Sequence, residues 1–116
     1  MSKPRSGRGM TGKPSLIYTV FGSSTEANQV ARTLIEEKLV ACANHFAPAV
    51  SQYVWEGEFC EEQEYPVLLK TLETQAEAAM QRLKTLHSYD TPAILSWPAD
   101  QSDPAYAKWL SEQIAL

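Results

Sequence analysis

Two amphipathic helical segments, set apart by a long extended stretch, constrain the fold of this chain more than any other feature. Apolar residues recur at helical spacing over residues 24–38 and again over residues 74–87. Runs rich in β-branched and aromatic residues come before, between and after these two segments. The alternation predicts a mixed domain in which two helices pack on one sheet.

Capping motifs mark the start of both predicted helices. Ser23 followed by Glu26, and Thr74 followed by Glu77, have the Ser/Thr-x-x-Glu spacing of a capping box. In such a box the hydroxyl and the carboxylate each accept a hydrogen bond from a free backbone N–H of the first turn. We therefore expect the first helix to begin at residue 24 and the second at about residue 74.

The outer strands and a last helix complete the order of elements. Residues 15–21 are predicted to form the first strand and residues 92–98 the last, each bounded by proline or glycine. Asp103 followed by Pro104 is typical of a helix start, and predicts a short C-terminal helix. The order predicts an α+β, ferredoxin-like βαββαβ sandwich with an extra C-terminal helix.

A long hairpin fills the region between the two helices. It runs from residue 39 to residue 72, and the pair Glu56-Gly57 marks its tight reversal. Pro48 predicts a bulge or an edge position, because proline cannot donate a hydrogen bond to the ladder. A straight arm of about 15 residues spans roughly 50 Å, whereas a globule of this size is roughly 34 Å across.

The overhang of this hairpin predicts self-association. Its distal part carries apolar side chains on both faces of the pleat, and an isolated two-stranded ribbon is only marginally stable in water. The alternative is that Pro48 bends the arm back onto its own sheet. Spacing along the sequence indicates association without giving a copy number. The residues predicted to form the interface are Tyr53, Val54, Trp55 and Phe59.

Charge is distributed unevenly along the chain. Residues 1–14 hold four of the ten Lys and Arg residues and no acid, so they carry +4 and residues 15–116 carry −8. Gly, Ser and Pro without aliphatic residues predict a disordered basic tail at 1–14, followed by a single domain at 15–116. The acidic domain argues against nucleic acid as a partner, because it would repel phosphates. No apolar run is long enough for a membrane helix, so no membrane partner is expected.

The two cysteines bear on the cellular compartment. Cys42 and Cys60 form no CxxC motif and no Cys/His cluster, which argues against a disulfide scaffold and against a zinc site. The start of the chain has no apolar segment typical of a secretory signal. We therefore expect two reduced thiols in a cytoplasmic protein.

Cys42 and His87 are the residues best suited to chemistry. A thiolate with an imidazole suits copper or zinc, but Cys42, His45, His87 and the acidic run 61–64 lack metal-motif spacing. Structural interpretations stay open as well. Cys42 suits a buried, unreactive thiol, His87 suits the C-terminal turn of a helix, and the acidic run suits a solvated strand edge. No oxyanion motif or orienting group accompanies the Cys/His pair, so we predict no catalytic residue and no enzyme.

Several spaced motifs resemble those of the CutA divalent-cation-tolerance family over about residues 16–113. The resemblance implies a ferredoxin-like fold and a tight homotrimer whose hairpins cross between subunits. It also implies a role in tolerance of divalent cations, copper binding in some members, and a likeness in shape to PII-type trimeric signalling proteins. It implies no catalytic reaction. The matching motifs are EEKLVACAN (36–44), WEG (55–57), LLKT (68–71) and HSYDTP (87–92), followed by Tyr106 and Trp109.

The resemblance implies site residues as well. Some bacterial members have a copper-ligating cysteine where this chain has Thr19, and adjacent histidines where it has Leu86-His87. The predicted metal ligands are therefore Cys42 and His87, with at most weak Cu(II) binding and no required cofactor. The alternative is a PII-like sensor or scaffold that binds a small anionic molecule in clefts between subunits. The predicted cleft residues are Lys70, Tyr89, Asp90, Tyr106 and Trp109.

Overall fold

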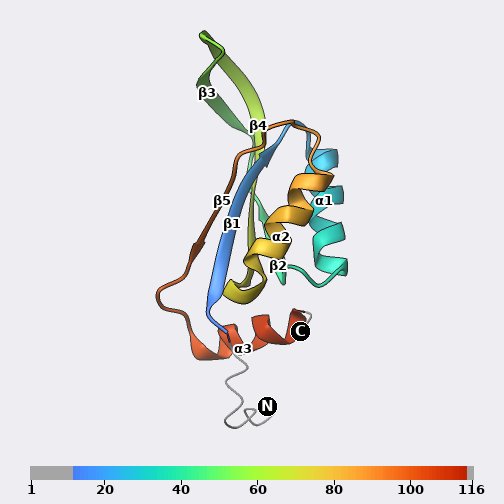
Figure 1. The fold of residues 1–116 in the computed structure, drawn as a ribbon, viewed down its shortest axis with the longest axis vertical. Helices are drawn as coiled ribbons and strands as arrows, with labels where there is room; N and C mark the ends of the chain where they lie inside the picture. The colour runs from blue at the N-terminus through green and yellow to red at the C-terminus, as the bar shows by residue number, and fades with distance from the viewer. Residues whose placement is uncertain (1–11, 115–116) are drawn as a thin grey trace.

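The structure, a computed structural model, describes residues 12–114. Its central strand is β1 (Pro14–Phe21), which pairs antiparallel with β4 (Glu58–Leu72) on one side and β5 (Ile94–Pro98) on the other. β2 (Cys42–His45) pairs with the other edge of β4, so the sheet has the order β2-β4-β1-β5. The predicted α+β, ferredoxin-like class is confirmed (Figure 1).

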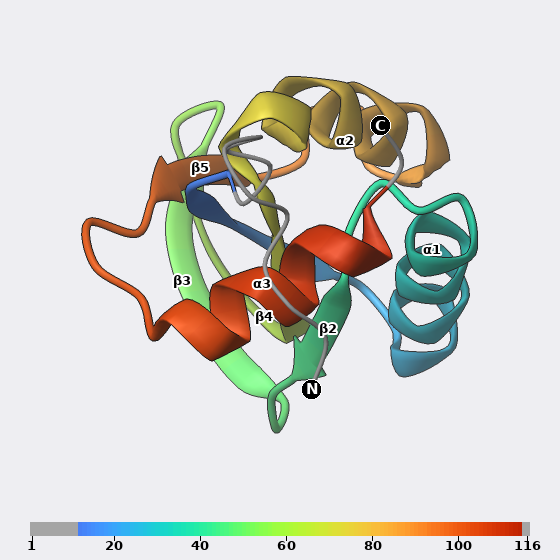
Figure 2. The same ribbon diagram turned by 90° about the horizontal axis from the view of Figure 1, so that it is seen from below.

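Two helices, α1 (Ser24–Glu36) and α2 (Glu73–Leu86), cover one face of this sheet (Figures 1 and 2). Their bounds lie within two residues of the predicted segments. Ile35, which belongs to the predicted apolar stripe of α1, is 38% exposed, because its neighbour Leu34 takes the inward position. The core under the helices comprises Ile17, Phe21, Ala27, Val30, Ala31, Leu34, Val40, Val67, Leu69, Ala79 and Leu83.

The C-terminal helix α3 (Pro104–Gln113) packs at the end of the sheet where β1 begins (Figure 1). Leu110 and Ile114 form a second small core with Ala41 and Leu72. The Asp103 carboxylate accepts a hydrogen bond from the Tyr106 backbone N–H at 3.0 Å, so the predicted helix start is confirmed.

The capping prediction holds for α1 in its Ser23 half and is wrong for α2; the Glu26 carboxylate accepts hydrogen bonds from the Ser88 N–H and hydroxyl at 2.8 and 2.9 Å. Ser23 Oγ accepts a hydrogen bond from the Glu26 N–H at 3.1 Å. α2 begins one residue early, at Glu73, without a side-chain cap, so Thr74 lies inside the helix. The physical reason is that β4 runs directly into α2, and the Glu73 N–H donates to the Lys13 carbonyl at 2.8 Å. The backbone at Lys13, just before β1, thus supplies the acceptor that a capping side chain would offer.

The hairpin of β3 (Ala49–Trp55) and the distal half of β4 projects from the domain (Figure 1). Glu56 and Gly57 form its tip with φ angles of +51° and +82°, the left-handed pair that a two-residue hairpin turn requires. The domain measures 55 × 26 × 23 Å, so the hairpin extends well past the helices. The predicted overhang is confirmed, and the alternative that Pro48 folds the arm back is wrong.

Pro48 lies in a bulge, as predicted. His45 pairs with Val67 and Ala49 pairs with Glu64, so three residues of the first arm face two residues of β4. One extra residue on one strand defines a bulge and increases the local twist. The bulge separates β2, which belongs to the main sheet, from β3, which belongs to the projecting ribbon.

The predicted basic tail lies outside the described residues, except for residues 12–14. Pro14 is the first residue of β1, and Lys13 accepts the hydrogen bond from Glu73, so the ordered domain begins before residue 15. Within residues 12–114, no helix is long and apolar enough to cross a membrane.

Candidate functional site

The two faces of the projecting hairpin are chemically different. Residues that pair across the ladder share a face, so Val54 with Phe59 lies on one face and Tyr53 with Cys60 on the other. The first face carries large apolar side chains that are open to solvent: Val54 is 67% exposed and Phe59 is 65% exposed, and the polar pair Gln52–Glu61 lies next to them. The predicted interface set is therefore divided, because Tyr53 and Trp55 lie on the face opposite to Val54 and Phe59.

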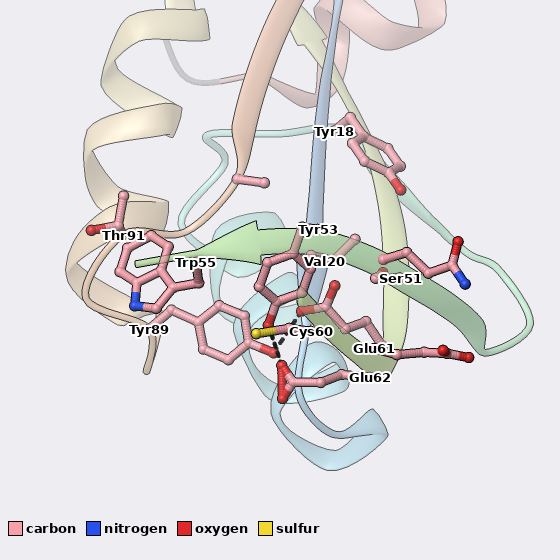
Figure 3. Close-up of a pocket in the computed structure, with 13 residues that line it drawn as sticks. Tyr18, Val20, Ser51, Tyr53, Trp55, Cys60, Glu61, Glu62, Tyr89 and Thr91 are labelled. Carbon is pink, nitrogen blue, oxygen red and sulfur yellow. Dashed lines mark hydrogen bonds between the residues drawn. The ribbon is translucent and has the colours of Figure 1, made fainter. Parts of the chain in front are cut away.

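A cavity of about 900 Å³ lies along the hairpin, from its root at Glu64 to Trp55 beside the tip (Figure 3). β1, β3, β4 and the segment that follows α2 all contribute to its wall. Most of its polar lining consists of carboxylates and phenols. The lining residues are Tyr18, Val20, Ser51, Gln52, Tyr53, Trp55, Cys60, Glu61, Glu62, Glu64, Tyr89, Thr91 and Ala93.

Two tyrosine–glutamate pairs organise the cavity wall. Tyr53 donates a short hydrogen bond to the Glu62 carboxylate, and Tyr89 donates to Glu64 at 2.8 Å. The bond to Glu62 raises the pKa of Tyr53 to about 12. Burial, and then the bond to Glu64, raise the pKa of Tyr89 above its ordinary value. Both phenols therefore stay protonated and act as donors at neutral pH.

Glu64 departs from the sequence-based interpretation of the acidic run as a solvated strand edge. Its side chain is only 7% exposed, because the hairpin root and Tyr89 cover it. Gly22 makes room for this arrangement, since a Cβ at that position would lie 3.2 Å from the Tyr89 hydroxyl oxygen. Sequence spacing offers no signal for this pairing, because Glu64 and Tyr89 are 25 residues apart.

His87 is buried between the end of β1 and the start of the loop to β5. Its Nδ1 accepts a hydrogen bond from the Tyr89 N–H at 3.1 Å, so Nε2 carries the proton and donates it to the Val20 carbonyl at 2.7 Å. Its ring also stacks on Phe21 with a centroid distance of 4.5 Å. Both ring nitrogens are therefore occupied by backbone groups.

The predicted copper ligands are not brought together. Cys42 pairs with Lys70, opposite Leu16, whereas His87 contacts the far end of β1 at Val20. Copper requires several ligands that converge with free lone pairs, and this donor set offers neither convergence nor a free nitrogen on His87. The residues do not fit a resident copper ion. In addition, no group of three or more His, Cys, Asp or Glu side chains within residues 12–114 is placed to hold a metal ion.

The predicted ligand-cleft residues fall into two places. The Lys70 ammonium lies 5.7 Å from the centroid of the Tyr106 ring, which stacks on Trp109 at 5.8 Å. The Tyr106 hydroxyl also lies 3.7 Å from Cys42 Sγ, and burial followed by this contact raises the pKa of Tyr106 to about 12. Tyr89 lies instead in the cavity at the hairpin root, and Asp90 beside it is exposed.

Fold and site together define a class of protein: a ferredoxin-like domain with an overlong hairpin and a phenol–carboxylate cavity along that hairpin. The family model of the CutA1 divalent ion tolerance protein matches residues 15–113. The chain belongs to this family, and the resemblance noted in the sequence is confirmed.

Individual relatives support the assignment over nearly the full domain. The divalent-cation tolerance protein CutA of Pyrococcus horikoshii is 40% identical over 84% of this chain and 95% of its own length. The crystal structure of CutA1 from Ehrlichia chaffeensis has a TM-score of 0.86 at 33% identity, covering 90% of this chain and 98% of that one. CutA from Archaeoglobus fulgidus, described as periplasmic, has a TM-score of 0.84 at 31% identity, covering 88% and 99%.

Proposed function

We propose that the protein serves tolerance of divalent cations as a non-enzymatic homotrimer in which the projecting hairpin is the assembly element. The observation that carries this proposal is the open apolar face of the hairpin. Val50, Val54 and Phe59 each expose about two thirds of their surface on that face. The polar pair Gln52–Glu61 lies between Val50 and the Val54–Phe59 pair on this face. Large exposed apolar side chains on an unsupported ribbon are typical of a surface that another copy covers.

The strand edges support a head-to-tail arrangement. Within the described residues, β3 pairs only with β4 and β5 pairs only with β1, so each has one free edge. These two edges are different surfaces, and contact between different surfaces on identical copies closes into a ring when the rotation fits. β5 also leaves Leu95 and Trp97 exposed, which adds apolar area next to its edge. The copy number of three comes from the resemblance to the CutA family.

The experiment is a mass measurement by light scattering on a sizing column at micromolar concentration. We expect about 39 kDa, three times the 12.9 kDa mass of the chain. Val54→Glu should lower the mass, because it places a charge in the apolar face of an already acidic hairpin. Ile35→Glu is the matched control, since Ile35 is an exposed apolar residue on α1, away from the hairpin. A wild-type mass of one chain would overturn the proposal.

The proposed function does not require a bound copper ion, since both ring nitrogens of His87 already make hydrogen bonds. The remaining soft ligand of the predicted pair is the Cys42 thiol, which is free and half-buried. Weak Cu(II) binding would therefore depend on Cys42 and on ligands from another part of the assembly. Isothermal titration calorimetry with Cu(II) on wild type and on Cys42→Ser tests this. Equal binding heats for the two proteins would exclude Cys42 as a copper ligand.

A second function, a sensor that binds a small aromatic anion, is favoured by the cluster of Lys70, Tyr106 and Trp109. A cation beside two stacked rings suits a ligand that has both a negative charge and a flat apolar body. Benzoate is a suitable probe. Benzoate binding should be lost in Lys70→Gln. Equal benzoate affinity of the variant and the wild type would exclude this cluster as an anion-binding site.

We also propose a cytoplasmic location, which the two free thiols of Cys42 and Cys60 support. Fractionation of cells that produce the full chain tests it. Recovery in a periplasmic fraction, as the description of the Archaeoglobus fulgidus protein suggests for that relative, would overturn this part of the proposal.

A further inference from the structure

We propose that Glu26 of α1 is a positioning residue for the contact between subunits. Its carboxylate holds a strap, the segment of residues 87–91 that follows α2, through two hydrogen bonds to Ser88. The strap in turn fixes the root of the projecting hairpin. The inference rests on the proposed function, because it concerns how the hairpin is presented to another copy.

The strap depends on side chains for its conformation. Its residues belong to no helix or strand, and they pass the end of β1 where α1 begins (Figure 1). The Ser88 N–H donates to the Glu26 carboxylate at 2.8 Å, and the Tyr89 N–H donates to the His87 imidazole at 3.1 Å. Two consecutive backbone N–H groups are thus bound by side chains, in place of the partners that a helix or a sheet supplies. Loss of one of these side chains therefore frees the strap.

Both oxygens of the Glu26 carboxylate are bound to the same residue of the strap. Oε2 accepts from the Ser88 backbone N–H at 2.8 Å, and Oε1 accepts from the Ser88 hydroxyl at 2.9 Å. Hydrogen bonds to an ionised carboxylate are stronger than those between neutral groups, and contact at two points also fixes orientation. The Glu26 side chain is only 21% exposed, so water screens these bonds weakly. Glu26 and Ser88 together form a latch on the helix side of the sheet.

The next residue of the strap reaches the opposite face of the sheet. Tyr89 lines the cavity along the hairpin (Figure 3), together with Tyr18 and Val20, which alternate with the core residues of β1 that face the helices. The Tyr89 hydroxyl donates to Glu64 at 2.8 Å, and Glu64 pairs with Ala49, the first residue of β3. Two consecutive residues of the strap therefore connect the latch to the root of the hairpin.

The root is where the hairpin needs this support. The Pro48 bulge separates β3 from the main sheet, so the ladder is interrupted just before Ala49. β3 has 7 residues from Ala49 to Trp55 and spans about 20 Å, with a rise of ~3.3 Å per residue. A tilt of about 10° at the root would move the tip by roughly 3.5 Å, enough to separate apolar groups that touch at about 4 Å.

The latch itself lies away from the apolar surface that another copy is proposed to cover. Val54 and Phe59, the exposed apolar pair, lie next to the hairpin tip. Glu26 and Ser88 lie at the start of α1 and the end of α2, on the helix side. Loss of the latch therefore removes no apolar contact between subunits, and any effect on assembly is transmitted through the strap.

The test measures how fast isotope-labelled and unlabelled full-length copies exchange subunits, followed by native mass spectrometry. Glu26→Ala removes both bonds of the latch, and we expect exchange at least about tenfold faster than in wild type. Ser88→Ala removes only the hydroxyl bond, so we expect a smaller increase of about threefold. Glu36→Ala is the matched control, because Glu36 lies at the other end of α1, exposed, in an ion pair with Arg32 of the same helix. It should change the rate by less than about twofold, and equal rates in Glu26→Ala and Glu36→Ala would overturn the inference.

A double variant tests the route through Tyr89. Tyr89→Phe removes the hydroxyl that holds Glu64, and we expect it to speed subunit exchange by about tenfold. Because Glu26 acts through Tyr89, Glu26→Ala added to Tyr89→Phe should speed exchange further by less than about twofold. Full multiplication of the two single effects would show that Glu26 acts on stability alone, and would contradict its positioning role.

Amide hydrogen exchange separates this inference from the proposed function, because it reports on the hairpin root at any copy number. In Glu26→Ala we expect the backbone amides of residues 49–51 to exchange at least about fivefold faster, and those of β1 to stay within about twofold of wild type. This pattern in a monomeric chain supports the latch and contradicts only the proposed trimer. A trimer in which neither the amides nor the subunits exchange faster contradicts only the latch.

Discussion

The imidazole Nε2 of His87 lies 2.7 Å from the backbone carbonyl oxygen of Val20, and this bond joins the loop after α2 to the end of the central strand. The same ring accepts the Tyr89 N–H and stacks on Phe21. His87 is therefore a fully packed structural residue that also positions Tyr89, whose hydroxyl donates to Glu64 in the cavity wall.

Replacement of His87 by Ala should lower the free energy of unfolding by about 2–4 kcal/mol, because it opens a gap and leaves a buried carbonyl and a backbone N–H without partners. Urea unfolding followed by circular dichroism measures this loss. His45→Ala, at the other and exposed histidine, should change stability by less than about 0.5 kcal/mol. Equal effects of the two substitutions would contradict the structural role of His87.

Thr19 and Thr71 are a matched pair with opposite predicted effects. Both are fully buried, but Thr71 Oγ1 donates to the Leu39 carbonyl at 2.7 Å, whereas Thr19 Oγ1 has no hydrogen-bond partner. Thr19→Val should raise the free energy of unfolding by about 1 kcal/mol, and Thr71→Val should lower it by about 1–2 kcal/mol. The two values come from the same unfolding measurement. A loss of stability in Thr19→Val would show that its hydroxyl has a partner after all.

Ser23 and Thr74 provide a second matched pair. Ser23→Ala should destabilise the protein by about 1 kcal/mol, because it removes the acceptor for the Glu26 N–H. Thr74→Ala should change stability by no more than about 0.5 kcal/mol, because Thr74 is an exposed residue inside α2 and caps nothing. Thermal unfolding of both variants checks the difference, and a larger loss in Thr74→Ala would contradict the observed start of α2.

Tyr53 should ionise late in an alkaline titration followed by absorbance near 295 nm. Its hydrogen bond to Glu62 raises its pKa to about 12, from about 10 in an unfolded chain. The contribution of this bond to stability is therefore complete below about pH 10, and is lost as the pH rises through about 12. Glu62→Gln should return the ionisation of Tyr53 toward pH 10, and Glu56→Gln should leave it unchanged. An unchanged ionisation curve of Tyr53 in Glu62→Gln would show that the hydrogen bond to Glu62 does not raise the Tyr53 pKa.

Much of the fold follows from local patterns in the sequence. The helical periodicity placed α1 and α2 within two residues of their observed bounds. The Glu56-Gly57 turn and the Pro48 bulge were predicted because proline and left-handed backbone conformations restrict the chain independently of distant contacts. The start of α2 was misplaced because its acceptor, the Lys13 carbonyl, comes from 60 residues away.

The candidate site was less predictable, since its residues meet only in three dimensions. The chemistry of Cys42 and His87 predicts a metal pair, but the two residues lie toward opposite ends of β1. The family motifs predict one ligand cleft that contains both Lys70 and Tyr89, but the fold separates these two residues. The acidic run predicts a solvated Glu64, whereas the fold buries it, because burial depends on what packs over a strand.

The sequence by itself thus determined the overlong hairpin, its tip and its negative charge, because strand length, turn residues and composition are local properties. Only the tertiary structure decided what the two faces of that hairpin do. The pairing of β3 with β4 places Val54 and Phe59 on the outer face and Tyr53 and Cys60 on the inner one. The bond from Tyr89 to Glu64 then closes the inner face into a cavity. The physical reason is that burial and hydrogen bonding depend on residues that the fold, and not the sequence spacing, brings into contact.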